Sequence, residues 1–335
     1  MSGRKSGTSS YLGRHTTLSY LALQPRVWRR IPYLRDNDGR APPIILAVGD
    51  RRRVHAISRR LANSVLLPES TARSSCRQVR EEDLPLTVEF GRVAMAIGTF
   101  SSIPVLVVET QMGSPATQII LNEVLSDELT SIDYDVGKTR IHLPHKVVIR
   151  IGTAGAINCY GMEVISVGNV VNATHSIGVT GAIIQTLTRL DFWRDGVLDG
   201  LANKWTSLGS AFTITRAGHP RVECSRDVVE AVDAAGERLL GSVYHKGGNV
   251  TKDSLYAELD ADAFLDLCRT ENCRTTEMEL SAIAVAAQEN AANFGMISGV
   301  VGVLPDAPFA ESEKAKGIAE QRSLRVAMEA VKRLI

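Results

Sequence analysis

The chain has 335 residues, of which 44% are hydrophobic and 22% are charged, close to the average for globular proteins. Lys and Arg number 38 and Asp and Glu number 37, and this balance lacks the basic excess that favours binding to nucleic acid. Because no apolar run reaches the roughly 20 residues that span a bilayer, we expect neither a membrane nor a nucleic acid among the partners of this protein.

Cysteine usage indicates the compartment. The five cysteines are odd in number, no two form a CxxC pair, and their spacing matches neither a zinc site nor a redox motif. We therefore expect free thiols in a reducing compartment and a cytoplasmic protein. The cysteines are Cys76, Cys159, Cys224, Cys268 and Cys273.

The first region of the chain is interpreted as an N-terminal arm. Residues 1–42 are polar and basic, and no apolar stretch follows the first residues that could form the core of a secretory signal. We expect this arm to be partly disordered. The pattern changes at Pro43, and no linker or repeat divides residues 43–335, which are expected to form one domain.

Apolar runs bounded by turn residues predict the elements of this domain in chain order. Residues 44–48 form a short, continuous apolar run typical of a buried strand, and a helical stretch follows it. Ser114 and Pro115 mark the start of another helix, and residues 126–146 are interpreted as an inserted loop. The further predicted strands are 86–97, 105–108, 147–151, 164–171, 210–215 and 294–304, and the further predicted helices are 226–239, 278–292 and 311–335.

Strands that recur between helices predict an α/β fold. We expect a single domain with a central mixed, mostly parallel β-sheet flanked by helices on both sides. In such a sheet, ligands bind beyond the carboxyl ends of the strands. The residues that follow each strand are therefore the candidates for a site.

The first strand end combines a glycine with basic residues. The segment from Gly49 to Arg53 (GDRRR) lies between the predicted strand and the helix. A glycine lets the backbone approach an anion, and a helix N-terminus and an arginine both attract negative charge. A solvated basic turn has the same composition, so this segment alone leaves both interpretations open.

The strand predicted at 147–151 carries Arg150 and is followed by Gly152 and Thr153. Burying a guanidinium group in an otherwise apolar strand is costly without an anionic partner. That partner is either a carboxylate of the protein or a bound oxyanion, and a second arginine beside a glycine turn favours the oxyanion. Thr153 adds a hydroxyl donor.

Glu277, Met278 and Glu279 stand at the start of the Ala-rich helix predicted at 278–292. Acidic residues in the first turn of a helix interact favourably with the helix dipole, but a carboxylate there can equally accept two hydrogen bonds from a sugar diol. Motifs of other enzyme classes are missing from the sequence, namely GxGxxG, GxxxxGKS/T, HExxH and GxSxG. We therefore predict no metal site and none of those chemistries.

Four segments, in this order, resemble the nucleoside phosphorylase family, which includes uridine phosphorylase and the bacterial-type purine nucleoside phosphorylases. They are VGDRRRV, TQMGSPATQIILNEVL, RIGTAGAI and TEMELSAIAVAA, and the match extends from about residue 44 to the C-terminus. Arg51 departs from the first segment, where the family has proline. The resemblance implies the family's fold and a reaction in which inorganic phosphate, as co-substrate, splits a nucleoside into free base and ribose 1-phosphate without a cofactor.

The resemblance also implies roles for the residues at the three strand ends. Glu279 is expected to hold the sugar hydroxyls and to act in catalysis together with Arg150, while Met278 binds the ribose and Glu277 is adjacent. The residues expected to hold phosphate are Gly49, Arg53, Arg150, Gly152 and Thr153.

Two further residues are expected to reach the site of a partner subunit. Arg92, in GRVAMAIG, resembles the arginine that a neighbouring subunit lends to the phosphate site. Tyr20 stands where the family often has a histidine that a partner chain offers to the ribose. The resemblance therefore implies a homodimer whose active sites are completed across the interface.

The segments that would read the base follow neither branch of the family. Residues 255–261 lack the Gln-x-Arg pair with which uridine phosphorylases read uracil, and the late acid of the purine enzymes has its counterpart only in Asp306, slightly beyond the expected place. RIGTAGAI and FGMISGVV favour uridine as substrate, and a purine nucleoside with Asp306 as catalytic acid is the alternative. A catalytically inactive paralogue that acts as a binding or regulatory subunit is the rival from another class. The phosphate-binding arginines argue against a nucleosidase.

Overall fold

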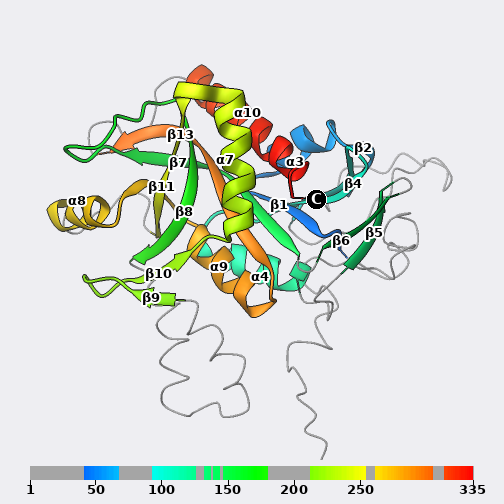
Figure 1. The fold of residues 1–335 in the computed structure, drawn as a ribbon, viewed down its shortest axis with the longest axis horizontal. Helices are drawn as coiled ribbons and strands as arrows, with labels where there is room; N and C mark the ends of the chain where they lie inside the picture. Colours follow the sequence, from blue (N-terminus) through cyan, green and yellow to red (C-terminus); the bar gives the residue numbers. More distant parts are fainter. Residues whose placement is uncertain are drawn as a thin grey trace, which may run out of the picture.

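The computed structural model shows a mixed α/β fold (Figure 1) and describes residues 41–67, 93–125, 132–136, 139–143, 146–179, 212–253, 261–304 and 313–334. Eleven strands join in one sheet, and two others form a separate two-stranded sheet. The strands of the large sheet are β1 (Ile44–Val48), β2 (Ala62–Leu67), β3 (Met95–Phe100), β4 (Ile103–Glu109), β7 (Val147–Ile157), β8 (Val170–Val179), β9 (Phe212–Ile214), β10 (Pro220–Glu223), β11 (Tyr244–Lys252), β12 (Cys273–Glu277) and β13 (Asn293–Leu304).

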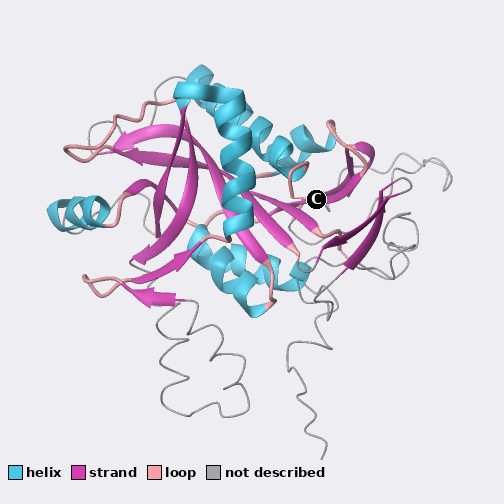
Figure 2. Ribbon diagram, viewed as in Figure 1, coloured by secondary structure: helices cyan, strands magenta, loops and turns pink. Residues whose placement is uncertain are grey.

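Helices cover both faces of the large sheet, as the sequence predicts (Figure 2). On one face, α4 and α9 pack against each other; on the other, α7 packs against α10, and α3 lies over β3 and β4. Among the described residues, no helix combines the length and the hydropathy that a transmembrane span requires. The helices are α3 (Arg51–Ser58), α4 (Ser114–Leu125), α7 (Arg226–Leu240), α8 (Ala261–Thr270), α9 (Leu280–Glu289) and α10 (Glu313–Val331).

Strand β1 shows how the two faces are filled. Ile45 and Ala47 pack into a core cluster with residues of α4 and α9, whereas the alternate side chains of β1 pack with residues of α3, α7 and α10. Because successive side chains of a strand point to opposite faces, a strand buried on both faces is apolar at every position. The uninterrupted apolar run at 44–48 is therefore the signature of a central strand.

Strand direction differs from the expectation. Six of the eleven pairings within the large sheet are antiparallel and five are parallel, so the prediction of a mostly parallel sheet is wrong. One reason is the tight turn between β3 and β4, where Ser101 and Ser102 have positive φ angles of 50° and 67°. A turn this short can only join antiparallel strands.

Five strands close into a ring at one end of the sheet. β13 pairs with both β7 and β8, β8 pairs with β11, β11 pairs with β12, and β12 returns to β7. Closure removes the free edges that these strands would otherwise expose. Strand β7 belongs to this ring and, through its pairing with β1, also to the open part of the sheet.

Several predicted boundaries also change. Residues 126–146 are not simply a loop, because β5 (Ile132–Val136) and β6 (Thr139–Leu143) pair as an antiparallel hairpin. The alternation in IDYDV and TRIHL is the period-two signal of a strand. The strand predicted at 164–171 begins only at Val170, and the helix predicted at 278–292 begins at Leu280. Besides β5 and β6, the described strands and α-helices that the sequence did not predict are β2, β10, β11, α8 and β12.

Candidate active site

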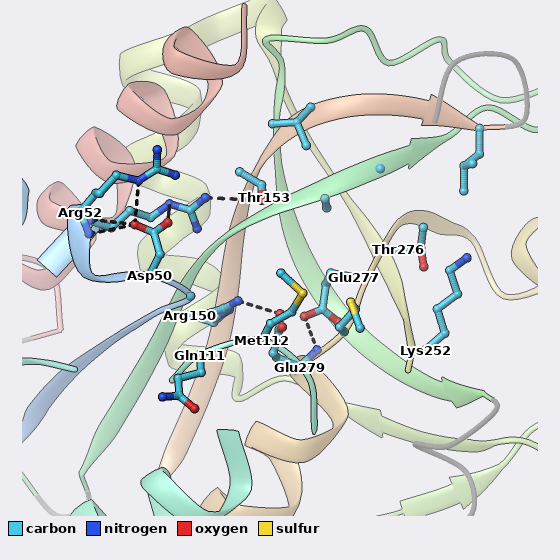
Figure 3. A pocket seen from close by; sticks show the side chains of 17 residues that line it. Asp50, Arg52, Gln111, Met112, Arg150, Thr153, Lys252, Thr276, Glu277 and Glu279 are labelled. Carbon is cyan, nitrogen blue, oxygen red and sulfur yellow. Dashed lines mark hydrogen bonds and ion pairs between the residues drawn. The ribbon is translucent and has the colours of Figure 1, made fainter. Parts of the chain in front are cut away.

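The register of three strands leaves a gap along one edge of β7. β1 runs parallel to β7 and ends at Val48, opposite Ile151, while β12 runs antiparallel to β7 and pairs Thr276 with Gly155. β13 occupies the whole of the other edge of β7. The carboxyl ends of β1 and β12 therefore approach each other beside residues 152–154. A cavity of about 370 Å³ lies at this point (Figure 3).

The turn from β1 to α3 forms the cationic end of the cavity. Asp50 caps α3, because its Oδ1 accepts hydrogen bonds from the backbone N–H groups of Arg52 (2.9 Å) and Arg53 (3.3 Å). The Arg53 side chain, only 16% exposed, donates to Glu320 Oε1 at 2.8 Å and lies 3.5 Å from Thr153 Oγ1. The basic segment is therefore not a simple solvated turn, although the Arg52 side chain remains largely exposed.

Gly49 allows an arginine to approach the end of β1. A Cβ atom at this position would lie 3.2 Å from Nη2 of Arg150, closer than an ordinary van der Waals contact. A side chain at position 49 would therefore displace the guanidinium group. The glycine of the first strand end therefore gives room to the Arg150 side chain.

Arg150 makes a buried ion pair with Glu279. Its Nη2 donates to Glu279 Oε2 at 2.6 Å, and its Nη1 donates to Thr110 Oγ1 at 3.0 Å. Glu279 Oε1 accepts from the backbone N–H of Gly113 at 2.8 Å, and the φ of +90° at Gly113 is one that glycine adopts readily. The anionic partner of Arg150 is thus a carboxylate of the protein. Arg150 also lies within β7 rather than at its end, because the strand continues to Ile157.

Glu277 is buried and fully engaged with its surroundings. Its carboxylate accepts hydrogen bonds from Asn249 Nδ2 and Thr251 Oγ1, each at 2.7 Å, and from the backbone N–H groups of Glu279 and Leu280 at the start of α9. Burial, followed by the charge of Glu279, raises the pKa of Glu277 to about 7. Glu277 therefore holds the beginning of α9 through hydrogen bonds. Glu279, by contrast, forms the ion pair with Arg150.

The end of the cavity next to β11 and β12 has a different composition. Lys252, the last residue of β11, lines the cavity together with Thr276, Val301 and Leu304. The Lys252 side chain is almost completely buried, and its Nζ lies 5.8 Å from the centroid of the Phe264 ring. This end of the cavity thus combines one ammonium group with mainly apolar walls.

Most of the predicted site residues meet in this one cavity. Gly152 lies in β7 beside Arg150 but does not line the cavity. Tyr20, Arg92 and Asp306 fall outside the described residues. The predicted residues that line the cavity are Gly49, Arg53, Arg150, Thr153, Glu277, Met278 and Glu279.

Sequence reasoning missed the lining that comes from β11 and from the segment between β4 and α4. Lys252 follows a polar, glycine-containing stretch that gave no strand signal, although a cation at a strand end is the feature that singled out Arg150. Gln111 and Met112 belong to one of the four family-like segments but were assigned no role. The lining residues without a predicted role are Asp50, Arg52, Gln111, Met112, Ala154, Gly155, Lys252, Thr276, Val301 and Leu304.

Comparison with known proteins identifies the family. The sequence model of one family, the phosphorylase superfamily, matches residues 43–333, nearly the whole chain. The chain belongs to the phosphorylase superfamily. No sequence among the curated proteins matches it significantly.

The fold of this phosphorylase-superfamily protein is also found in solved structures. One is the crystal structure of purine nucleoside phosphorylase from Toxoplasma gondii in complex with immucillin-H, which is 18% identical with a TM-score of 0.56. The similarity covers 87% of this chain and 90% of that chain. At this level of identity the likeness establishes the fold of the superfamily member, not its substrate.

Proposed function

We propose that this phosphorylase-superfamily protein is a nucleoside phosphorylase, which uses inorganic phosphate to convert a nucleoside into free base and ribose 1-phosphate. The observation that carries the proposal is a single cavity with arginines at one end and a buried carboxylate, Glu279, farther along the same wall. A phosphorylase must hold an anion next to a sugar diol, and these are the groups suited to each.

Phosphate is proposed to bind between Gly49, Arg53 and Thr153. The position lies at the N-terminus of α3, where the helix dipole favours an anion; the backbone N–H groups of Arg52 and Arg53 there are already bound by Asp50. Arg53 faces the cavity and its guanidinium group can form charge-assisted hydrogen bonds with two phosphate oxygens. Arg150 adds positive charge to this position from β7. Its Nε is buried and has no hydrogen-bond partner among the described residues, so it can donate to the anion.

Glu279 is proposed to hold the ribose. Each of its carboxylate oxygens accepts one hydrogen bond from the protein and keeps a further lone pair for a sugar hydroxyl. Breaking the glycosidic bond places positive charge on the sugar ring and negative charge on the departing base. The buried carboxylate and the bound phosphate stabilise the ring, so positioning and electrostatic preorganisation supply most of the acceleration.

The assembly is proposed to be a homodimer in which Arg92 and Tyr20 complete the site of the partner subunit. Met112 supports a partner at the cavity mouth, because it lines the cavity while 71% exposed. The proposed location is the cytoplasm: the cysteines of the described residues, all buried, are free thiols.

Uridine is the proposed substrate, on the resemblance of RIGTAGAI and FGMISGVV to the uridine enzymes. The alternative is a purine nucleoside, which the short interval between Tyr256 and Glu277 favours, with Asp306 as the acid. The experiment measures release of free base from uridine, thymidine, inosine and adenosine, with a phosphate-free control.

Phosphate-dependent cleavage of uridine would support the proposal as stated. Cleavage of purine nucleosides alone would assign the protein to the other branch. A folded protein that binds ribose 1-phosphate but turns over none of the four nucleosides would contradict phosphorylase activity and favour a binding or regulatory subunit.

A further inference from the structure

Lys252 places a positive charge at the end of the cavity remote from Arg53. The β1 end of the cavity lies beside Ile151 of β7, whereas β12 pairs with β7 at Gly155, and β11 is the next strand beyond β12. Figure 3 shows Lys252 and Thr276 on the side of the cavity opposite Arg52. If phosphate lies at the arginine end and ribose at Glu279, the remaining space beside Lys252 is that of the nucleobase.

We infer that Lys252 is the residue that reads the nucleobase, by donating a hydrogen bond to an exocyclic carbonyl oxygen on the edge remote from the sugar. This inference rests on the proposed function and specifies its substrate class. The favoured bases carry an oxo group at pyrimidine C4 or purine C6, as in uracil, thymine, hypoxanthine and guanine. Cytosine and adenine present an amino group there and are disfavoured.

The chemistry of the ammonium group requires this preference. An ammonium group donates three hydrogen bonds and accepts none. It therefore complements a carbonyl oxygen and opposes an amino group, which is also a donor. The ring of Phe264 offers the ammonium only the face of a π-system at 5.8 Å. Because Lys252 is buried, its desolvation is best compensated by polar acceptors, and a base oxygen in the cavity would add an acceptor to the contacts that Lys252 makes within the protein.

The same contact assists bond cleavage. A phosphate oxygen forms a bond to the anomeric carbon as the carbon–nitrogen bond to the base breaks, and the electron pair of that bond moves to the base. In an oxo base this negative charge is delocalised onto the carbonyl oxygen, beside the Lys252 ammonium, and the base later takes a proton from water. A cation in a cavity with apolar walls stabilises the developing charge more than it would in bulk water.

The test compares Lys252→Met with the unmodified protein and with Lys246→Met. Lys246 lies on the same strand, is exposed and pairs with Asp233 outside the cavity, so its substitution is the matched control. For each protein, kcat/KM is measured for uridine against cytidine and for inosine against adenosine. Binding of ribose 1-phosphate by calorimetry reports separately on the integrity of the phosphate and sugar sites.

The unmodified protein and Lys246→Met are expected to prefer the oxo nucleoside of the pair they use. Lys252→Met is expected to lose about 10- to 100-fold in kcat/KM for that nucleoside, the range for a hydrogen bond to a charged group. The preference of Lys252→Met for the oxo nucleoside over the amino nucleoside should disappear. Its affinity for ribose 1-phosphate should stay within about twofold of that of the unmodified protein. Unchanged preference in Lys252→Met, or equal losses for oxo and amino substrates with weaker ribose 1-phosphate binding, would overturn the inference.

Failure of the proposed function would look different. If the unmodified protein cleaves no nucleoside, the binding of free bases in the presence of ribose 1-phosphate still tests Lys252. Tighter binding of uracil than cytosine, or of hypoxanthine than adenine, that is lost in Lys252→Met would support the base-reading role. Equal or undetectable binding of these bases would refute it.

Discussion

The two ends of the cavity are encoded in different ways. At the arginine end, one continuous segment from Gly49 to Arg53 supplies the glycine, the helix cap and the cation. At the opposite end, Lys252 and Thr276 belong to different strands and line the same wall only because β11 and β12 pair in register. Local chemistry is visible in a sequence, whereas a wall assembled by strand pairing is not. This is why the sequence pointed to the residues of the arginine end and not to Lys252.

The two arginines of the cavity also differ in how their charge is balanced. Arg150 pairs with Glu279, and this pair is almost completely buried, whereas Arg53 pairs with Asp50 and Glu320, whose side chains are partly exposed. Breaking a buried ion pair destabilises the protein strongly, whereas exchanging one partner of a partly exposed pair for another anion changes its stability little. The first arrangement suits a fixed element of the site, and the second suits a position where a ligand anion replaces a side chain.

The largest expected effect comes from breaking the buried pair. Arg150→Met would leave the Glu279 carboxylate buried without its cation and should lower the free energy of unfolding by about 3–5 kcal/mol. Phosphorolysis should fall below detection. Urea denaturation followed by circular dichroism measures the first effect, and base release measures the second.

The matched control is the double variant Arg150→Met with Glu279→Gln. Removing both charges should restore part of the lost stability, because no uncompensated charge remains. Activity should stay absent, since both groups are assigned to the site. A single Arg150→Met variant within about 1 kcal/mol of the unmodified protein would show that the pair is not a fixed structural element.

The next effect concerns pH. The pKa of Glu277 is about 7 in the folded protein against 4.5 as its ordinary value. A raised carboxyl pKa means that the folded state retains a proton that the unfolded state releases. The contribution of this proton to the free energy of unfolding is fully present below pH 4.5 and is lost as the pH rises through 7. The free energy of unfolding differs by about 3 kcal/mol between these two limits.

Glu277→Gln should remove this part of the pH dependence, since an amide does not titrate. Denaturation measured at intervals from pH 4.5 to 8 should give a flatter profile for this variant. Glu230→Gln, at an exposed glutamate of α7, should keep the slope of the unmodified protein. An identical slope in Glu277→Gln would mean that another group titrates.

A moderate effect is expected at the arginine end, where phosphate is proposed to bind. Arg53→Ala should raise the KM for phosphate by about 10- to 100-fold, because one charge-assisted contact to the anion is lost. The free energy of unfolding should change by no more than about 1 kcal/mol, since the pairs with Asp50 and Glu320 that it breaks are partly exposed. Arg59→Ala, at the exposed end of α3, is the control and should leave both quantities unchanged. A normal phosphate KM in Arg53→Ala would remove the basis for placing phosphate at this end.

Whether a buried strand can be recognised from the sequence depends on whether its residues are apolar or polar. The run at 44–48 and the apolar part of β13 are buried on both faces, so their sequences are continuous and easily read. β11 is also buried, but its Asn249 and Thr251 are satisfied by hydrogen bonds with Glu277. A buried polar strand looks like a loop until its partners are known. The ring of strands was missed for this reason, and with it the position of Lys252.

The smallest expected effect tests whether Glu320 competes with phosphate. Glu320 Oε1 lies 2.8 Å from Arg53 Nη2, so the proposed phosphate would compete with this carboxylate for the same guanidinium group. Glu320→Gln removes the competing charge and should lower the KM for phosphate by about two- to fivefold, in keeping with the modest energy of a partly exposed ion pair. Glu329→Gln, elsewhere on α10, is the control. A raised phosphate KM in Glu320→Gln would instead show that Glu320 holds Arg53 in its binding position. The Arg53–Glu320 pair would then be a fixed element of the site, like the pair of Arg150 with Glu279.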